Sequence, residues 1–435
     1  MCTADRPTVP TGGSLLVAVG PPALPRPKPA TPGAVVLALD ESGSMDNPLA
    51  PGGPSRRALV GRGLAAAAAA LGKQAPVHVV RFATRVETVY SGTAGDLAAD
   101  PSLARPPRAV GGSTNVEAAL AEAAGHLRGH PGPRRIVLLT DGEATDGRRT
   151  ADELAVLGKE LAAEGIHIDA LGIGAEAHDT VLSALVGTTG QTAHAAASTA
   201  GAETFAQTCA DLVRWGSRAY VQGGTLEVLV HPQWRVAEVR RTHPQSRVLA
   251  TAVSPGPQGT SLVTLPLGAF GGERLRPAFV VELVAPATTE PAQQIVQAQG
   301  VVLVEGERLT LDGSSCADIR PEVAVPGSAY FAHDPTLGEL VERARLQEAV
   351  DAMVSQLPAD QAARVYAEGA TRARQQCLPE LAEDFSDALR ALDQGGDVRD
   401  VQSATRARAT RARSQVADVL GETRPRAPRP DHNQR

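Results

Sequence analysis

The chain has 435 residues, of which 43% are hydrophobic and 21% are charged, and its formal net charge is −6. At about 100–200 residues per domain, this length predicts several domains, each able to bury a core without disulfides. The charge balance excludes a polycationic nucleic-acid binder and an acidic disordered chain. An aromatic content of 3% also disfavours stacking on single-stranded nucleic acid.

Cysteine usage and the first residues bear on the compartment. The cysteines at positions 2, 209, 316 and 377 show no CxxC spacing, which favours neither a disulfide framework nor a zinc site. The polar start MCTADRPTVP lacks the features of a secretory signal, and no apolar run reaches the roughly 18 residues of a transmembrane helix. We therefore expect a cytoplasmic protein without membrane insertion.

The first part of the chain predicts an α/β unit. Residues 1–32 form a tail with one strand, SLLVAV (14–19), that we expect to join a later β-sheet. Over residues 33–215, apolar runs alternate with helical patterns, which predicts a Rossmann-like fold with a parallel sheet flanked by helices. The predicted buried strands are AVVLALD (34–40), VHVVRFA (77–83), IVLLTDG (136–142) and IHIDALGIG (166–174), with VETVYS (86–91) as an edge neighbour.

Two further regions follow, and their patterns differ. Over residues 216–328 the hydrophobic period falls to two between Gly- and Pro-rich turns, which predicts a β-sandwich domain. Over residues 329–422 helical spacing returns, with helices expected from Asp334-Pro335 onwards and at 359–376, 379–393 and 397–420. Residues 423–435 are expected to be a disordered tail.

The pattern that carries chemistry begins where the first long strand ends. Asp40, Ser42 and Ser44 place one carboxylate and two hydroxyls at alternate positions of a short loop. In open α/β sheets, ligands bind outside the carboxyl ends of the strands. Such hard oxygen ligands suit Mg²⁺, which commonly keeps some of its waters.

Two distant residues are predicted at the same edge. Thr114 precedes a helix within Gly-Ser-Thr-Asn, and Asp141 ends the apolar strand IVLLTDG. A hydroxyl and a second carboxylate there would complete an oxygen ligand set. Each piece alone would indicate only a turn or a helix cap; their order and positions together predict a metal site.

AVVLALDESGSM, GGSTN and IVLLTDGE, in this order, resemble the von Willebrand factor type A domain. The resemblance covers about 180 residues. Its metal-ion-dependent adhesion site is a DxSxS loop plus a distant Thr and Asp, which match Asp40, Ser42, Ser44, Thr114 and Asp141. The order of regions also looks like that of bacterial YfbK-like proteins and, distantly, of inter-alpha-trypsin inhibitor heavy chains.

The resemblance implies that the two serines bind a cation directly, with Mg²⁺ expected and Mn²⁺ or Ca²⁺ as alternatives. The Thr binds directly or through water, the Asp residues act largely through water, and one position stays open for an acidic side chain of a protein partner. Together with the expected cytoplasmic location, it implies an intracellular metal-dependent interaction module. The alternative is an adaptor or regulatory subunit of an ATP-driven AAA⁺ complex of MoxR or metal-chelatase type.

Other chemistries find little support in the sequence. There is no GxxxxGK[ST], HExxH or GxSxG, so we expect no catalytic residues and no nucleotide cofactor. A metal-assisted hydrolase would need a general base, for which Glu41 and Glu143 are the local candidates. Glu41 and Asp46 are otherwise expected to be exposed, and His78 and His167 to be hydrogen-bonded core residues. The arginines at 406, 408, 411 and 413 indicate a solvated helix.

Overall fold

The structure is a computed structural model. It describes residues 2–4, 13–21, 24, 31–49, 52–100, 112–141, 144–174, 179–187, 189–190, 192–195, 202–217, 219–243, 247–249, 253–271, 277–286, 295–304, 307–311, 336–354, 357–398, 401–402 and 405. The predicted tail at 423–435, most of the helix predicted at 397–420 and its four arginines lie outside these residues, as does Asp334-Pro335.

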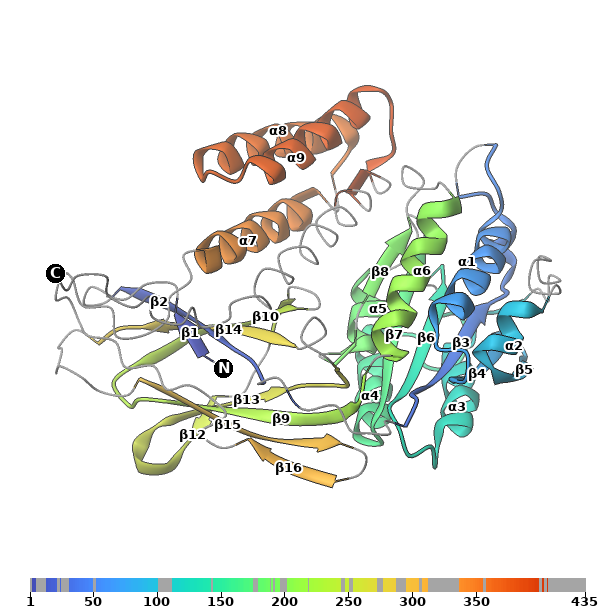
Figure 1. Cartoon of the computed structure of the whole chain (residues 1–435). Coiled ribbons are helices and arrows are strands. Elements are labelled where there is room, and N and C mark those ends of the chain that lie inside the picture. The colour runs from blue at the N-terminus through green and yellow to red at the C-terminus, as the bar shows by residue number, and fades with distance from the viewer. Residues whose placement is uncertain are drawn as a thin grey trace, which may run out of the picture.

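A six-stranded sheet forms the centre of the α/β unit (Figure 1). Its order is β5-β4-β3-β6-β7-β8, and all neighbours are parallel except β4 and β5. The α/β fold is as predicted, but the sheet is mixed rather than parallel, because the short link between β4 and β5 allows only a hairpin. The strands are β3 (Ala34–Asp40), β4 (Pro76–Phe82), β5 (Val86–Thr93), β6 (Arg134–Thr140), β7 (Ile166–Ile173) and β8 (Thr192–Ala195).

Helices cover both faces of this sheet, and they bury both sides of the central strand β3. Its residues 35, 37 and 39 pack with α1, α2 and α6, while residues 34, 36 and 38 pack with α3, α4 and α5. This alternation follows from the two-residue period of a strand. The helices are α1 (Arg56–Ala70), α2 (Ala94–Ala99), α3 (Val116–Leu127), α4 (Ala151–Ala163), α5 (Asp179–Val186) and α6 (Ala202–Ser217).

Two five-stranded antiparallel sheets share one apolar core and form a β-sandwich. One sheet has the order β1-β2-β14-β10-β11 and the other β12-β13-β9-β15-β16. The N-terminal strand β2 pairs with β14, so the chain enters the sandwich, leaves for the α/β unit and returns. The elements are β1 (Cys2–Ala4), β2 (Ser14–Val19), β9 (Val221–Val230), β10 (Arg235–His243), β11 (Arg247–Val248), β12 (Val253–Pro255), the 3₁₀ turn η4 (Pro257–Gly259), β13 (Ser261–Pro266), β14 (Ala278–Val284), β15 (Val296–Val304) and β16 (Glu307–Leu311).

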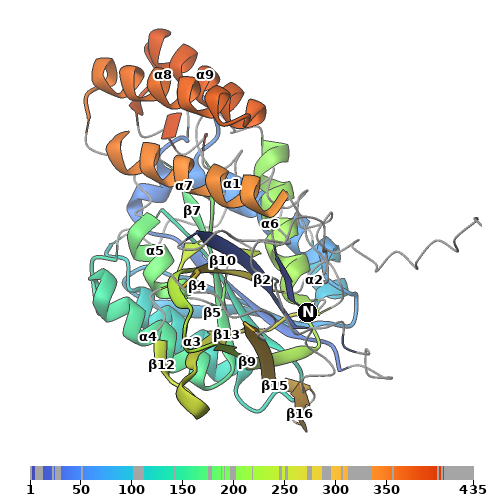
Figure 2. The same ribbon diagram turned by 90° about the vertical axis from the view of Figure 1, so that its left-hand side faces the viewer.

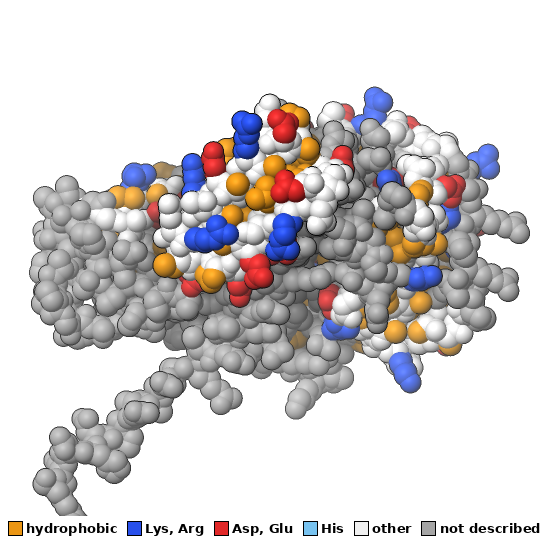
Figure 3. All heavy atoms as spheres, turned by 90° about the horizontal axis from the view of Figure 1, so that it is seen from above, with side chains coloured by type: hydrophobic (Ala, Val, Ile, Leu, Met, Phe, Trp, Pro, Cys, Tyr) orange, Lys and Arg blue, Asp and Glu red, His pale blue; other side chains and the backbone are white. Residues whose placement is uncertain are grey.

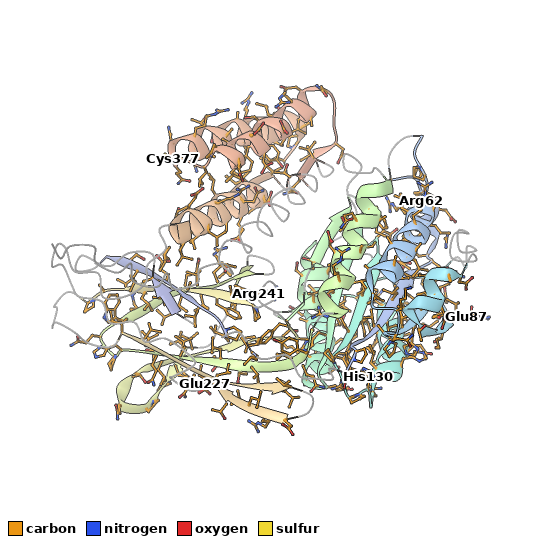
Figure 4. The ribbon with its side chains drawn as sticks, in the orientation of Figure 1. Arg62, Glu87, His130, Glu227, Arg241 and Cys377 are labelled. Atoms are coloured by element: carbon orange, nitrogen blue, oxygen red, sulfur yellow. The ribbon has the colours of Figure 1, made fainter. Side chains whose placement is uncertain are left out.

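The sandwich contacts the edge of the α/β sheet where its strands begin. Figure 4 shows Arg241 on the side of the sandwich that faces the α/β unit. Hydrogen bonds to carbonyl oxygens join the units, among them those from Arg135 to Ala269 (3.3 Å), from His167 Nε2 to Gln222 (2.8 Å) and from Arg241 to Gly190 (2.9 Å). The opposite edge, where β3 and β6 end, therefore points away from the sandwich.

His167 and His78 differ in their surroundings. His167 is buried and donates to the sandwich as described, and burial lowers its pKa to about 4. His78 is only half-buried: it hydrogen-bonds the Ser91 hydroxyl and stacks on His126 with ring centroids 4.5 Å apart. The prediction of a hydrogen-bonded core histidine is thus confirmed for His167, whereas His78 is hydrogen-bonded but not fully buried.

Three C-terminal helices follow the sandwich: α7 (Thr336–Val354), α8 (Ala359–Gln375) and α9 (Pro379–Asp393). Helix α7 packs on the outer face of one sandwich sheet, and α8 and α9 stack on α7 (Figure 2). Charge pairs fasten α7 to the sheet. Arg240 of β10, which is 2% exposed, binds Glu348 at 2.6 Å, and Arg345 of α7 binds Glu282 and, at 3.3 Å, Glu238. Within the described residues, no helix combines the length and apolar character needed to cross a membrane.

Candidate metal centre

Asp40 ends β3 and is 1% exposed. Its Oδ1 accepts the backbone N–H of Ser42 at 2.8 Å, and its Oδ2 accepts the hydroxyl of Thr140 at 2.6 Å. Burial raises the pKa of this carboxyl to about 6; the hydrogen bonds from Thr140 and Ser42 oppose the rise, while the charge of Asp141 adds to it. Asp40 is therefore fixed in orientation at the carboxyl end of the central strand.

A short 3₁₀ turn brings the two serines of the loop together. The turn η1 (Gly43–Asp46) follows Ser42, and Met45 anchors it by burying its side chain completely in the core beneath α1. The hydroxyl oxygens of Ser42 and Ser44 lie 3.0 Å apart. One carboxylate and two hydroxyls of the predicted set thus share one compact loop.

Thr114 lies at the same edge, in the segment before α3. The N–H of its neighbour Asn115 donates to the carbonyl of Ala83, just after β4, and the Asn115 side chain caps α3. The Thr114 N–H donates to the hydroxyl of Thr145 at 2.7 Å, and its carbonyl accepts from the N–H of Thr145 at 3.0 Å. Backbone bonds therefore hold Thr114 between the ends of β4 and β6, and its side chain is 4% exposed.

Asp141 follows β6 and is 3% exposed. Its Oδ2 accepts a hydrogen bond from Arg56 Nη1 at 3.0 Å, which makes a buried ion pair with the first residue of α1. Gly174, just after β7, provides room for this guanidinium: a Cβ there would lie 3.0 Å from Arg56 Cζ. The sequence prediction missed this arginine.

Two more arginines surround the loop. Arg57, 3% exposed, donates Nε to Asp46 at 2.8 Å and Nη2 to the carbonyl of Ser42 at 3.2 Å. Arg81 of β4 pairs with Glu41 at 3.1 Å. Glu41 was expected to be exposed, and this is wrong: it is 1% exposed, because it faces Arg81 of the neighbouring strand. Burial raises its pKa, while Arg81 and Arg57 oppose the rise.

One signal in the sequence pointed to these arginines. Both Arg56 and Arg57 occupy the first turn of α1, which contains no acidic residue. Cations are unfavourable at this end of a helix, because the helix dipole places partial positive charge there. Their presence indicates negative charge nearby, but only the fold identifies which carboxylates they meet.

The donor set suits a hard cation. Carboxylates and hydroxyls at this edge are ligands of the kind that Mg²⁺, Mn²⁺ and Ca²⁺ prefer. Among the described side chains, no three His, Cys, Asp or Glu residues gather as a metal cluster, so the fit rests on Asp40 and Asp141 together with hydroxyl oxygens. Asp40, Ser42 and Ser44 are assembled by direct contacts; Asp141 is close enough to act on Asp40 electrostatically; Thr114 shares their edge.

The comparisons with known proteins agree with this fold. Residues 35–143 match the family model "von Willebrand factor type A domain". The α/β unit therefore has the fold of a von Willebrand factor type A domain. Such domains often bind a divalent metal ion. No curated protein matches the chain.

Two solved structures resemble nearly the whole chain. The von Willebrand factor type A protein from Catenulispora acidiphila is 16% identical, with a TM-score of 0.67, and the match covers 88% of each chain. The ArnB paralog VWA2 from Sulfolobus acidocaldarius is also 16% identical, with a TM-score of 0.51, and the match covers 95% of this chain and 98% of that one. At these identities the likeness shows the fold alone, including the units beyond the A domain.

Proposed function

We propose that this chain is a cytoplasmic, metal-ion-dependent protein-interaction module. Asp40, Ser42, Ser44, Thr114 and Asp141 would hold Mg²⁺, or Mn²⁺ or Ca²⁺, and a protein partner would supply an Asp or Glu side chain. The observation that carries the proposal is the geometry of the Asp40 loop, with its serine hydroxyls 3.0 Å apart and its carboxylate fixed by Thr140. Nucleic acid and membrane insertion play no part in it.

The side chains support binding through their charge and their fixed positions. When bound, the cation supplies the Lewis-acidic centre that a carboxylate recognises. Ser42, Ser44 and Thr114 contribute neutral oxygens, so they neutralise little of a cation's charge. Thr140 and the Ser42 N–H hold Asp40 in one orientation, which lowers the cost of ordering the site when a ligand arrives.

The position of the site favours contact with another protein. Arg135 and Thr140 belong to the same strand, and five residue steps of about 3.3 Å separate them by roughly 16 Å. Arg135 contacts the sandwich, whereas Thr140 contacts Asp40. The metal edge is thus at the far end of the sheet from the sandwich.

A hydrolytic role is less well supported than binding. A general base must be free to accept a proton near the reacting centre. Glu41, one of the two local candidates, is buried and paired with Arg81 at 3.1 Å, so its carboxylate is engaged in an ion pair. The other candidate, Glu143, lies outside the described residues. We therefore propose a non-enzymatic role.

A second candidate is an adaptor of an ATP-driven AAA⁺ complex of MoxR or chelatase type. The C-terminal helices favour it, because α7 is attached to the sandwich, whereas the metal residues belong to the α/β unit. Figure 3 shows acidic and basic side chains interspersed with apolar ones over these helices. Co-purification of an ATPase that depends on α7–α9 but not on Asp40 would support this role over a stand-alone binder.

The decisive experiment is metal-dependent capture from native lysate. The wild-type chain, Asp40→Ala and the surface control Asp211→Ala are immobilised in Mg²⁺ and eluted with EDTA. We expect the same eluted partner from the wild type and from Asp211→Ala, and none from Asp40→Ala. Equal capture by all three, or capture unaffected by EDTA, would contradict the proposal.

A further inference from the structure

Among the described side chains, all but one of the carboxylates around the Asp40 loop pair with an arginine. Four carboxylates surround the loop: Asp40, Glu41, Asp46 and Asp141. Three of them pair with an arginine, at 3.1 Å for Glu41, 2.8 Å for Asp46 and 3.0 Å for Asp141. Among the described side chains, Asp40 instead bonds the Thr140 hydroxyl and the Ser42 N–H. Counted over these four carboxylates and the three arginines, all ionised, the net charge is one negative.

A divalent cation in this cluster would reverse the sign and leave one net positive charge. Arg56 accounts for that excess. Without it, the charges of Asp40, Asp141 and the divalent metal ion would sum to zero. We propose that Arg56 is a specificity-determining residue, whose charge weakens cation binding and gives the loaded site its attraction for one carboxylate. This rests on the proposed metal-dependent binding.

Two observations show that the surrounding structure specifically accommodates the Arg56 side chain. The guanidinium is buried, with a side-chain exposure of 7%, at a helix end where the dipole disfavours a cation. Gly174 has φ +94°, and a Cβ there would lie only 3.0 Å from the guanidinium carbon of Arg56. A buried arginine in such a slot keeps its charge close to the carboxylates, where screening by water is weak.

The first measurement is cation affinity. Mn²⁺ is titrated into the full-length wild type, Arg56→Gln, Arg56→Lys and Arg62→Gln by calorimetry. Arg62 is an exposed residue of the same helix, labelled in Figure 4, and serves as the matched control. Arg56→Gln is expected to lower the Mn²⁺ Kd on the order of tenfold, because a repelling charge is removed. Arg56→Lys and Arg62→Gln should stay near the wild type.

The second measurement is carboxylate affinity of the Mn²⁺-loaded protein. N-acetyl-aspartate amide is added, with N-acetyl-asparagine amide as the uncharged control, and displacement of Mn²⁺-bound water is followed by proton relaxation. Arg56→Gln should bind the aspartate probe on the order of tenfold more weakly than the wild type, although it binds Mn²⁺ more tightly. Opposite shifts in the two affinities are the signature of a charge effect, because a merely distorted site would weaken both.

The outcomes separate this inference from the proposed function. An unchanged or higher Mn²⁺ Kd in Arg56→Gln, or an equal shift in Arg56→Lys, would overturn the role of Arg56 and leave the metal site standing. Absence of Mn²⁺ binding to the wild type, or binding equal to that of Asp40→Ala, would overturn both. If Arg56→Gln does not fold, Arg56→Met, which keeps a long side chain and removes the charge, takes its place, and its Mn²⁺ Kd must fall for the proposal to hold.

Discussion

The hydroxyl of Thr140 donates to Asp40 Oδ2 at 2.6 Å, across two neighbouring parallel strands. The bond is buried, and it links the end of β6 to the loop that carries the serines. One hydroxyl thus orients a carboxylate that the backbone of Ser42 holds from the other side.

Replacing Thr140 by Val removes this donor and keeps the shape of the side chain. Since a buried acceptor is left without its partner, we expect the free energy of unfolding to fall by about 1–3 kcal/mol. The Mn²⁺ affinity should fall with it, because Asp40 is no longer fixed. Chemical denaturation and calorimetry measure the two effects. Thr371→Val, at an exposed position of α8, is the control and should change neither by much; equal effects of both substitutions would refute the assigned role.

Cation binding should stabilise the folded chain through Asp40. At a Mg²⁺ concentration of ten times the Kd, the gain expected from linkage is about 1.4 kcal/mol. A thermal melt in Mg²⁺ and in EDTA should therefore differ for the wild type and for Asp211→Asn, but not for Asp40→Asn. A metal-dependent shift that survives in Asp40→Asn would place the cation elsewhere.

The buried histidine between the two units predicts a pH dependence of stability. The pKa of His167 is about 4 in the folded chain, below the unperturbed value of about 6.5, because burial disfavours the charged ring. Its contribution is therefore complete above about pH 6.5 and is lost as the pH falls towards 4, since the unfolded chain takes up the proton first. The expected loss between pH 7 and pH 5 is about 2 kcal/mol.

Denaturation at pH 7, 6 and 5 checks this loss. His167→Gln keeps a hydrogen-bond donor but cannot be protonated, so its unfolding free energy should change less over this range than that of the wild type. His231→Gln, outside the interface, should keep the wild-type slope. Parallel slopes for the wild type and His167→Gln would show that other groups cause the pH dependence.

A pair of glycine substitutions separates backbone strain from the space that Arg56 needs. Gly174 and Gly187 both have positive φ, +94° and +63°, but only Gly174 has a neighbour that a Cβ would meet. Gly187→Ala should cost about 1 kcal/mol for the left-handed conformation. Gly174→Ala should cost more, by roughly 1–3 kcal/mol of overpacking. Equal losses in denaturation experiments would show that the guanidinium moves without penalty.

Much of the fold was predictable because parallel strands have a strong local signal. The fully buried runs at 34–40 and 166–173 admit helices on both faces, and the domain fold is confirmed. The strand β8 was missed, since four residues of low hydrophobicity carry no periodic pattern. The antiparallel direction of β5 depends on the short link after β4, which the hydrophobic pattern does not weigh.

The sequence predicted at which edge of the sheet the site lies, but it did not predict which arginines pair with its carboxylates. The places where β3 and β6 end follow from the sequence, so Asp40 and Asp141 were expected at one edge. The partner of Asp141 lies 85 residues away, on a helix whose rotation against the sheet is set by tertiary packing. The burial of Glu41 depends in the same way on Arg81 of the neighbouring strand. Ion pairs between residues far apart in the chain leave no signal in the local sequence pattern.

The pairing of β2 with β14 has a consequence for how the chain is made. Ser14 and Glu282 hydrogen-bond across a sequence separation of 268 residues. At about 5–20 residues per second, a ribosome needs tens of seconds to supply the strand that β2 requires. By the end of that interval the whole α/β unit has been synthesised, whereas the edge of β2 that pairs with β14 has had no partner. Synthesis from the N-terminus therefore favours an order in which the metal-site unit folds before the sandwich is complete.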